Sequence, residues 1–154
     1  KWQPKRSIEW AARVLQVSLP PGPRCIPQRA VVDSAKGATL PFFCWLLWWA
    51  GNETHSGAVY AAMHGSYGVL WCLKSRIFPD PQWERRVTPL SALVNALWLL
   101  GYWGGGVVLV LGKGEVAPAR LGAAVLLYAL GVTLMMCADT QKCAASSLGH
   151  CCYC

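Results

Sequence analysis

The chain has 154 residues, of which 55% are hydrophobic and 14% are charged, and its formal net charge is +7. A soluble domain carries charge on about 25% of its residues, so this composition argues against a soluble protein. Positive charge beside apolar segments is typical of membrane proteins, which makes nucleic-acid binding a poor explanation of the basic excess. The composition therefore predicts an all-α fold, a polytopic transmembrane helical bundle with three or four membrane segments in contact with lipid.

The N-terminal part, residues 1–38, is basic and is expected to be cytosolic. Residues 1–19 mix apolar and charged side chains and include a capping Ser7, which predicts a short amphipathic helix. Such a helix either lies on anionic lipid or is a connector that packs on a missing part of the protein. Residues 20–38 have the composition of a loop. Because the chain starts with Lys1 rather than Met, we interpret it as a fragment or an incomplete gene model.

The first apolar block, residues 40–51, has only 12 residues. A helix needs about 17–25 residues to cross a bilayer, so this block predicts a tilted, short or re-entrant segment. The alternative is a segment that begins earlier, near Ala30. The polar stretch 51–56 forms a tight connection, and its sequon at Asn52 is expected to be unused because it lies so close to the membrane.

The second block, residues 57–73, has 17 residues without Asp, Glu, Lys or Arg, which is just long enough for a span. Lys74 and Arg76 follow it. Pro79 and Pro81 then prevent further helix, because proline lacks the N–H donor and disfavours helical backbone in the residue before it. The pattern predicts a membrane span that ends in a structured, basic loop.

The third and fourth blocks, residues 87–111 and 117–138, are 25 and 22 residues long and contain one charged side chain, near the start of the fourth. Both lengths predict membrane spans. In the third block, Gly101 and Gly105 form a small-xxx-small pattern, and the run Gly104-Gly105-Gly106 removes side chains where another helix or a lipid-like ligand can approach. Asn95 in the same block predicts a hydrogen bond to another helix.

The distribution of positive charge predicts the orientation. Twelve of the 14 Lys and Arg residues fall in residues 1–38, 74–86 and 139–154. The positive-inside rule places these three segments in the cytosol and the chain in a membrane as an integral protein. The predicted organisation is a cytosolic segment 1–38, a transmembrane region 39–138 and a cytosolic, cysteine-rich tail 139–154.

Two blocks of sequence carry a family resemblance. The first, Pro41–Arg86, reads PFFCWLLWWAGNETHSGAVYAAMHGSYGVLWCLKSRIFPDPQWERR, and the second, Cys137–Lys142, reads CADTQK. In this order they resemble the uncharacterised branch of the steroid 5-alpha-reductase-like membrane oxidoreductases. The resemblance implies an all-helical, multi-span enzyme of the endoplasmic reticulum or a bacterial inner membrane. It also implies that NADPH reduces a carbon–carbon double bond conjugated to a carbonyl in a steroid or similar lipid.

The resemblance also implies candidate cofactor-binding residues. The acidic position matching Asp139 lies at the cytosolic end of a span in this family and helps to hold NADPH, which makes Asp139, Gln141 and Lys142 candidate contacts. A carboxylate can accept hydrogen bonds from ribose or amide groups, and a lysine can bind phosphate. The alternative is an ordinary polar helix end at the membrane interface.

His64 and Tyr67 are the candidate catalytic residues. They are three positions apart and share one helix face. They loosely resemble the His-Tyr pair with which steroid reductases polarise the substrate carbonyl, although Gly65 stands where the family has a tyrosine. A Tyr hydroxyl or His N–H can donate to an enone oxygen and stabilise the enolate. The alternative is that both side chains make hydrogen bonds between helices.

The chain departs from this family after Lys142. Family members continue through further helices with an Arg-x-Pro-x-Tyr-type motif, whereas this chain continues as CAASSLGHCCYC. We therefore expect an incomplete NADPH site and a chain that is inactive by itself. The alternative is a non-catalytic membrane protein that uses its helix bundle for structural or partner-binding purposes. The tail cysteines are poorly spaced for zinc, so no metal site is predicted, and palmitoylation is an alternative use for them.

Overall fold

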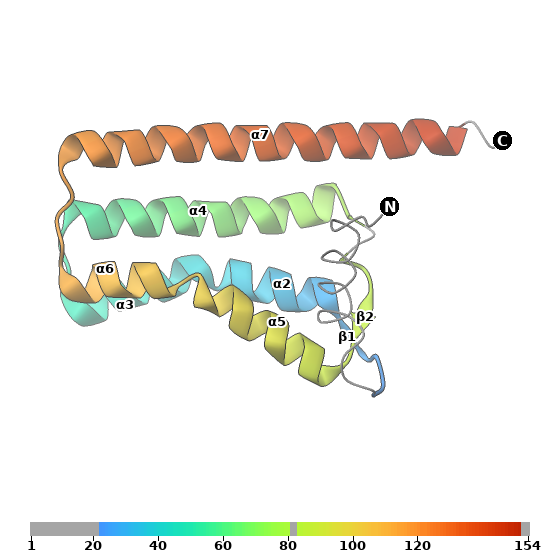
Figure 1. Ribbon diagram of the computed structural model, residues 1–154, viewed down its shortest axis with the longest axis horizontal. Coiled ribbons are helices and arrows are strands. Elements are labelled where there is room, and N and C mark those ends of the chain that lie inside the picture. The colour runs from blue at the N-terminus through green and yellow to red at the C-terminus, as the bar shows by residue number, and fades with distance from the viewer. Residues whose placement is uncertain (1–21, 81–82, 152–154) are drawn as a thin grey trace, which may run out of the picture.

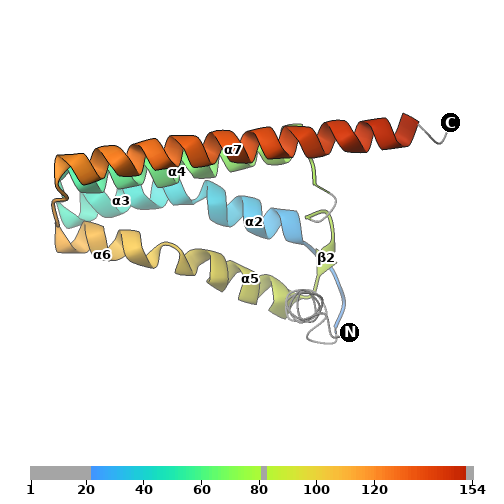
Figure 2. The ribbon, with the colours of Figure 1, turned by 45° about the horizontal axis from the view of Figure 1, so that its top comes forward.

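The computed structural model describes residues 22–80 and 83–151, which are mostly helical. In chain order the elements are β1 (Ile26–Pro27), α2 (Gln28–Gly37), α3 (Thr39–Ala50), α4 (His55–Ile77), β2 (Arg86–Val87), α5 (Pro89–Gly101), α6 (Gly104–Gly112) and α7 (Pro118–Cys151). Figures 1 and 2 show α2 followed by α3 and α5 followed by α6, with α4 and α7 beside them. The helical prediction is confirmed, apart from the short antiparallel pair β1–β2. The predicted amphipathic helix over residues 1–19 and the tail residues 152–154 lie outside the described residues.

Two helical stretches are long and apolar enough to cross a membrane, by length and composition alone. They are Pro89–Gly112, which contains an 18-residue window with a mean hydropathy of 1.6, and Pro118–Lys142, which contains one with a mean hydropathy of 2.1. The rest of the chain buries 11% of the first window and 0% of the second, so their apolar surfaces face outward. The two stretches correspond to the third and fourth apolar blocks.

The loop predicted for residues 20–38 is wrong over α2. The first N–H groups of this helix donate to the backbone oxygens of Arg85 and Trp83, at 2.9 Å each. Helix N-termini need such external acceptors or solvent for their unpaired N–H groups. Val32 of the helix is buried. Because its start depends on a distant segment of the chain, local composition did not show this helix.

α3 continues almost directly from α2. The Ala38 N–H donates to the Ser34 oxygen at 2.9 Å, and the Phe42 N–H donates to the Ala38 oxygen at 3.0 Å. The helical hydrogen-bond pattern therefore runs through the junction. The helical segment that contains the first apolar block therefore begins before Ala30. This agrees with the alternative prediction that the segment starts near Ala30 rather than at residue 40.

α4 is the central helix, and it contacts α2, α3, α6 and α7. Its N-cap is Thr54, whose hydroxyl accepts from the Gly57 N–H at 3.1 Å. Its last residue is Ile77, and Phe78 is the C-cap. This end confirms the helix stop that was predicted ahead of Pro79.

Two glycines let α4 approach α2 and α3 closely. A Cβ added at Gly65 would overlap the side chain of Leu40, and one added at Gly68 would overlap the backbone carbonyl of Lys36. Neither position can carry a side chain without moving the helices apart. The core next to this contact consists of Phe43, Leu46, Ala61 and Val110.

The third apolar block forms two helices rather than one straight span. A turn at Trp103 separates α5 from α6 (Figure 1). The Trp103 indole N–H donates to the Thr39 hydroxyl at 3.2 Å, and its ring stacks on Phe42 with 4.3 Å between ring centres. Glycines around the turn weaken the helix. The single helix expected over residues 87–111 is therefore interrupted by contacts with α3.

The glycines of this block differ in their packing. A Cβ added at Gly101 or Gly105 meets no atom within 4 Å, so the predicted small-xxx-small pair makes no helix contact in the described chain. A Cβ added at Gly106 would overlap the rings of Tyr60 and Phe43. Gly106 is therefore the glycine that lets α6 lie against α4 and α3.

Polar contacts join the loops at one end of the bundle. Glu115, in the loop before α7, accepts hydrogen bonds from the Ser56 hydroxyl at 2.8 Å and from the His55 N–H at 3.0 Å. Asn52 is buried, and its amide donates to the Val110 oxygen at 2.6 Å, so the sequon nitrogen is engaged. The β1–β2 pair and the C-terminal part of α7 lie at the opposite end (Figure 1). The charge pattern likewise predicts that the polar stretch 51–56 lies opposite the basic segment that follows α4.

Replacement of Gly106 by alanine tests the packing of α6. The new methyl group overlaps two rings, so we expect a loss of about 1–3 kcal/mol in the free energy of unfolding. The matched control is Gly105→Ala, which should be neutral or stabilising by up to about 1 kcal/mol because alanine favours helix. Helical circular dichroism during denaturant unfolding in detergent measures both variants. Equal effects of the two substitutions would contradict the packing described above.

The Glu115 contacts generate a pH prediction. The hydrogen bond from the Ser56 hydroxyl, together with backbone N–H groups, holds the pKa of the Glu115 carboxyl below its ordinary value. Charged Glu115 therefore stabilises the fold above the unfolded pKa of about 4.3, and this contribution is lost as the pH falls through the lower folded pKa. We expect Glu115→Gln to lower the unfolding temperature at neutral pH and to have less effect in acid.

The control for this experiment is Glu53→Gln, which removes an exposed carboxylate at the same end of the bundle. It should leave the unfolding temperature unchanged at every pH. A difference between wild type and Glu115→Gln that stays constant from neutral pH into acid would show that the carboxylate does not stabilise the loop junction.

Candidate functional site

A cavity of about 500 Å³ lies between α2, α4 and α5. This volume is within the roughly 300–1,000 Å³ of ordinary small-molecule sites. Both predicted catalytic residues, His64 and Tyr67, face it, so the structure brings them together in one site. Most of the remaining lining is aromatic or apolar and consists of Val32, Trp71, Trp83, Trp98, Leu99 and Tyr102. The three further polar side chains in the lining are Gln28, Lys36 and Asn95.

Lys36 of α2 contacts Tyr67 of α4 at the cavity wall. Its Nζ donates to the Tyr67 hydroxyl oxygen at 3.3 Å. The same nitrogen lies 4.4 Å from the centre of the Tyr67 ring and 5.1 Å from that of Trp71, within the range of cation–π attraction. In the part of the chain that the structure describes, no carboxylate pairs with Lys36.

This contact defines what Tyr67 can do. Its oxygen accepts a hydrogen bond from a cation, and no described residue accepts the proton of its hydroxyl. That proton is therefore left to donate to a bound ligand. A hydrogen bond received from a charged donor polarises the hydroxyl and strengthens its own donation.

Aromatic contacts orient His64. Its ring stacks on Tyr60 with 4.9 Å between centres, and the edge of Phe43 approaches at 6.2 Å. Among the described residues, none makes a hydrogen bond to its ring nitrogens. The imidazole can therefore offer a second polar contact to a ligand in the cavity, one helical turn from Tyr67.

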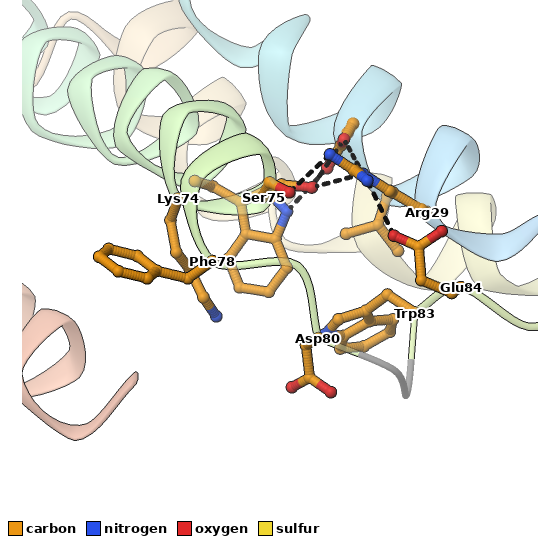
Figure 3. A pocket seen from close by; sticks show the side chains of 10 residues that line it. Arg29, Lys74, Ser75, Phe78, Asp80, Trp83 and Glu84 are labelled. Carbon is orange, nitrogen blue, oxygen red and sulfur yellow. Dashed lines mark hydrogen bonds and ion pairs between the residues drawn. The ribbon is translucent and has the colours of Figure 1, made fainter. Parts of the chain in front are cut away.

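A polar network supports the wall formed by Trp71. Asp33 accepts hydrogen bonds from the Trp71 indole N–H at 3.2 Å and from the Ser75 hydroxyl at 2.9 Å. Figure 3 shows Arg29 between Ser75 and Glu84, to which it donates at 3.0 and 2.8 Å. The network ties α2, α4 and the segment before β2 together. It holds the Trp71 ring in place beside Lys36 and Tyr67.

Asn95 has a different partner from the one predicted. Its amide donates to the Ser91 oxygen within α5 at 2.9 Å. The expected hydrogen bond to another helix is therefore wrong, because the preceding turn of α5 supplies the acceptor. Asn95 still lines the cavity, where its amide carbonyl can accept a hydrogen bond.

The three candidate cofactor residues lie on α7, away from the cavity wall. Asp139 binds Lys74 at 2.7 Å through one carboxylate oxygen and Lys142 at 3.3 Å through the other. The side chains of Lys74 and Asp139 are 8% and 11% exposed, so this ion pair is largely buried between α4 and α7. Gln141 is exposed, and the Lys142 side chain is 72% exposed.

Lys74 connects this ion pair to the cavity. Its Nζ lies 4.6 Å from the centre of the Trp71 ring, which forms part of the cavity wall. Sequence reasoning treated Lys74 as the end of a span and did not pair it with Asp139. The two residues are far apart in the chain, and only the packing of α7 on α4 brings them together.

Lys36 was also missed, because it was counted only as positive charge that orients the chain. One sequence pattern could have indicated Lys36 as a site residue, because it shares an amphipathic helix with Val32, Asp33 and Arg29. That pattern is recognisable only once residues 28–37 are known to be helical. The hydrogen bond joins residues 31 positions apart.

Comparisons with protein-family models, curated proteins and solved structures give no significant match. The structural support for a function is therefore the cavity and its polar wall.

Proposed function

We propose that the chain binds a membrane-soluble steroid or lipid with a conjugated carbonyl and polarises that carbonyl through Tyr67, as part of an NADPH-dependent reductase of carbon–carbon double bonds. The observation that carries the proposal is the Tyr67 hydroxyl, held by Lys36 at the wall of a largely aromatic cavity. The family resemblance supplies the reaction type. The cavity supplies a site of suitable size and polarity for such a ligand.

Reduction of an enone moves negative charge onto the carbonyl oxygen as the distant carbon accepts hydride. A hydrogen-bond donor that already points at this oxygen lowers the barrier, because it needs no reorganisation during the reaction. Tyr67 is positioned to donate, and the positive charge of Lys36 offsets the developing oxyanion. His64 offers a second donor on the same helix face.

The aromatic side chains account for the rest of the ligand. Trp71, Trp98 and Tyr102 present broad apolar surfaces that suit fused rings or a hydrocarbon skeleton. Asn95 and Gln28 also line the cavity and can bind a second polar group of the ligand. An apolar compound with one carbonyl near Tyr67 fits this distribution.

NADPH, when bound, supplies the hydride. Gln141 and Lys142 have exposed side chains, and Lys142 suits a phosphate contact. Asp139 already uses both carboxylate oxygens on lysines. We therefore assign Asp139 to the positioning of Lys74 and Lys142 rather than to direct contact with the nucleotide.

The proposal includes a polytopic arrangement with three or four membrane segments, in the endoplasmic reticulum or an inner membrane. The two apolar stretches supply two of these segments, and α2–α3 and α4, which lie alongside them, supply the others (Figure 2). Trp48 and Trp49, at 78% and 63% exposed, suit an interfacial aromatic belt at the end opposite β1–β2. The cavity lining includes Gln28, at the start of α2, and Trp83, shortly before β2, at the end of the bundle assigned to the cytosol.

The second candidate function is a non-catalytic bundle that packs against a partner in the membrane. The observation that favours it is the outward-facing leucine surface of α7, which includes Leu127 and Leu134 at 69% exposed each. Lipid covers such a surface equally well. Ligand binding at Tyr67 distinguishes the two candidates.

The first test measures the binding of progesterone, a steroid enone, to the purified chain in detergent. Hydrogen bonding to the carbonyl should shift the enone absorption band to longer wavelength. Tyr67→Phe should abolish the shift and weaken binding by about five- to tenfold, since one hydrogen bond contributes about 1–1.5 kcal/mol.

The matched control is Tyr102→Phe, which removes a hydroxyl from the same cavity but not the one that Lys36 contacts. It should retain both the shift and the affinity. Equal losses of the absorption shift and of affinity in the two variants would contradict the proposed role of Tyr67. No binding by the wild-type chain would favour the non-catalytic candidate.

The second test concerns topology and uses single cysteines in a variant whose native cysteines are replaced. Glu53 and Arg76 are both exposed and lie at opposite ends of α4. In sealed membrane vesicles, an impermeant thiol reagent should label Glu53→Cys from one face and Arg76→Cys from the other. Labelling of both from the same face would rule out α4 as a membrane span.

A further inference from the structure

A second opening lies on the other flank of His64 and Tyr67, between α4 and α7. It has a volume of about 250 Å³, and α7 contributes Tyr128, Gly131, Val132 and Met135 to its walls. The hydroxyl of Tyr128 is engaged with the Ser66 hydroxyl at 2.8 Å. The remaining α7 side chains in the wall are apolar or absent. We call this space the α4–α7 groove.

The groove and the main cavity have two lining residues in common, His64 and Tyr67. Gly65 and Gly68 pack on α3 and α2 along one flank of α4. Along the other flank, Ser66 contacts Tyr128 and Lys74 contacts Asp139. His64 and Tyr67 occupy the face between these flanks, which is why they line both spaces.

Two polar contacts fix the dimensions of the groove. The Ser66–Tyr128 hydrogen bond and the Lys74–Asp139 ion pair hold α7 to α4 at two points. The groove residues Gly131, Val132 and Met135 fall between Tyr128 and Asp139 on α7. Gly131 leaves the space open, since a Cβ added there meets no atom within 4 Å.

We propose that the α4–α7 groove binds the hydrocarbon tail of the same ligand whose carbonyl binds Tyr67. This inference rests on the proposed function and narrows its substrate class to carbonyl lipids that carry a flexible tail beside the polarised group. The apolar wall of Val132 and Met135 suits a hydrocarbon chain and offers it no polar partner. His64 and Tyr67 line both spaces, so the tail of a ligand whose carbonyl binds Tyr67 lies next to the groove.

The outer surface of α7 supports a membrane-soluble ligand. The rest of the chain buries none of the residues in its apolar 18-residue window, so the outer face of this helix meets lipid hydrocarbon in a bilayer. The groove lies along the inner face of α7, where Tyr128, Val132 and Met135 are half-buried while Leu127 and Leu134 point away. A tail dissolved in the bilayer can reach the groove sideways without crossing water.

The test compares two alkenyl methyl ketones that share one conjugated head, one with a short unbranched tail and one with a long tail. Their binding to the full chain in detergent is followed by the enone absorption shift. Gly131→Leu fills the groove and should lower the affinity for the long-tailed ketone by about tenfold. This is the low end of steric effects in apolar pockets. It should leave the short-tailed ketone unchanged, and Val132→Phe should act in the same way.

The matched control is Gly122→Leu, the same substitution on the same helix at a position that also has no neighbour within 4 Å and lies outside the groove. It should change neither affinity. Comparison of variants with one ligand at a time cancels the partitioning of each ketone into detergent. Retained binding of the short-tailed ketone shows that each variant is folded.

The failures of the two proposals give different results. If Tyr67→Phe weakens both ketones but Gly131→Leu and Val132→Phe affect long and short tails equally or not at all, the carbonyl site stands and the tail groove is overturned. If neither ketone binds the wild-type chain, the proposed function fails and the groove inference fails with it.

Discussion

The rest of the structure depends on the close contact of α4 with α2 and α3. Gly65 and Gly68 bring the helix backbone against Leu40 and the carbonyl of Lys36. This contact places the Lys36 ammonium beside the Tyr67 hydroxyl and the Trp71 ring. A larger side chain at either glycine would separate the helices, and with them the two groups that define the site. The site is therefore a consequence of backbone packing as much as of side-chain chemistry.

Polar groups hold the ends of a chain that is otherwise apolar. Glu115 closes one end, and the network around Asp33 and Arg29 closes the other. Within the described residues, no buried side-chain nitrogen or oxygen lacks a hydrogen-bond partner. Unpaired polar groups are costly in an apolar environment, so such contacts select one arrangement of the helices. Between the two ends, the cavity and the groove remain open around His64 and Tyr67.

Sequence reasoning found the features that depend on composition and local pattern. It identified the apolar stretches now seen in α5–α6 and α7, the end of α4 ahead of Pro79, and the shared face of His64 and Tyr67. It assigned residues 20–38 to a loop and offered a helix from Ala30 only as an alternative, because the first N–H groups of α2 bind backbone oxygens far along the chain. It missed Lys36 and the Lys74–Asp139 pair for the same reason, since each contact forms only after α4 has packed. Likewise, Gly106 and not Gly101 is the tightly packed glycine of this block, because the helix face that carries Gly106 meets Tyr60.

The central claim of this account is that a carbonyl lipid binds against the Lys36–Tyr67 wall, inside the bundle. A steroid enone that forms covalent adducts on ultraviolet irradiation, followed by peptide mass spectrometry, tests that claim most directly. The account predicts adducts on cavity residues such as Trp71, Trp98 and Tyr102, and their loss when excess unreactive ligand competes. Adducts confined to the outward-facing leucines of α7, unaffected by competition, would contradict it.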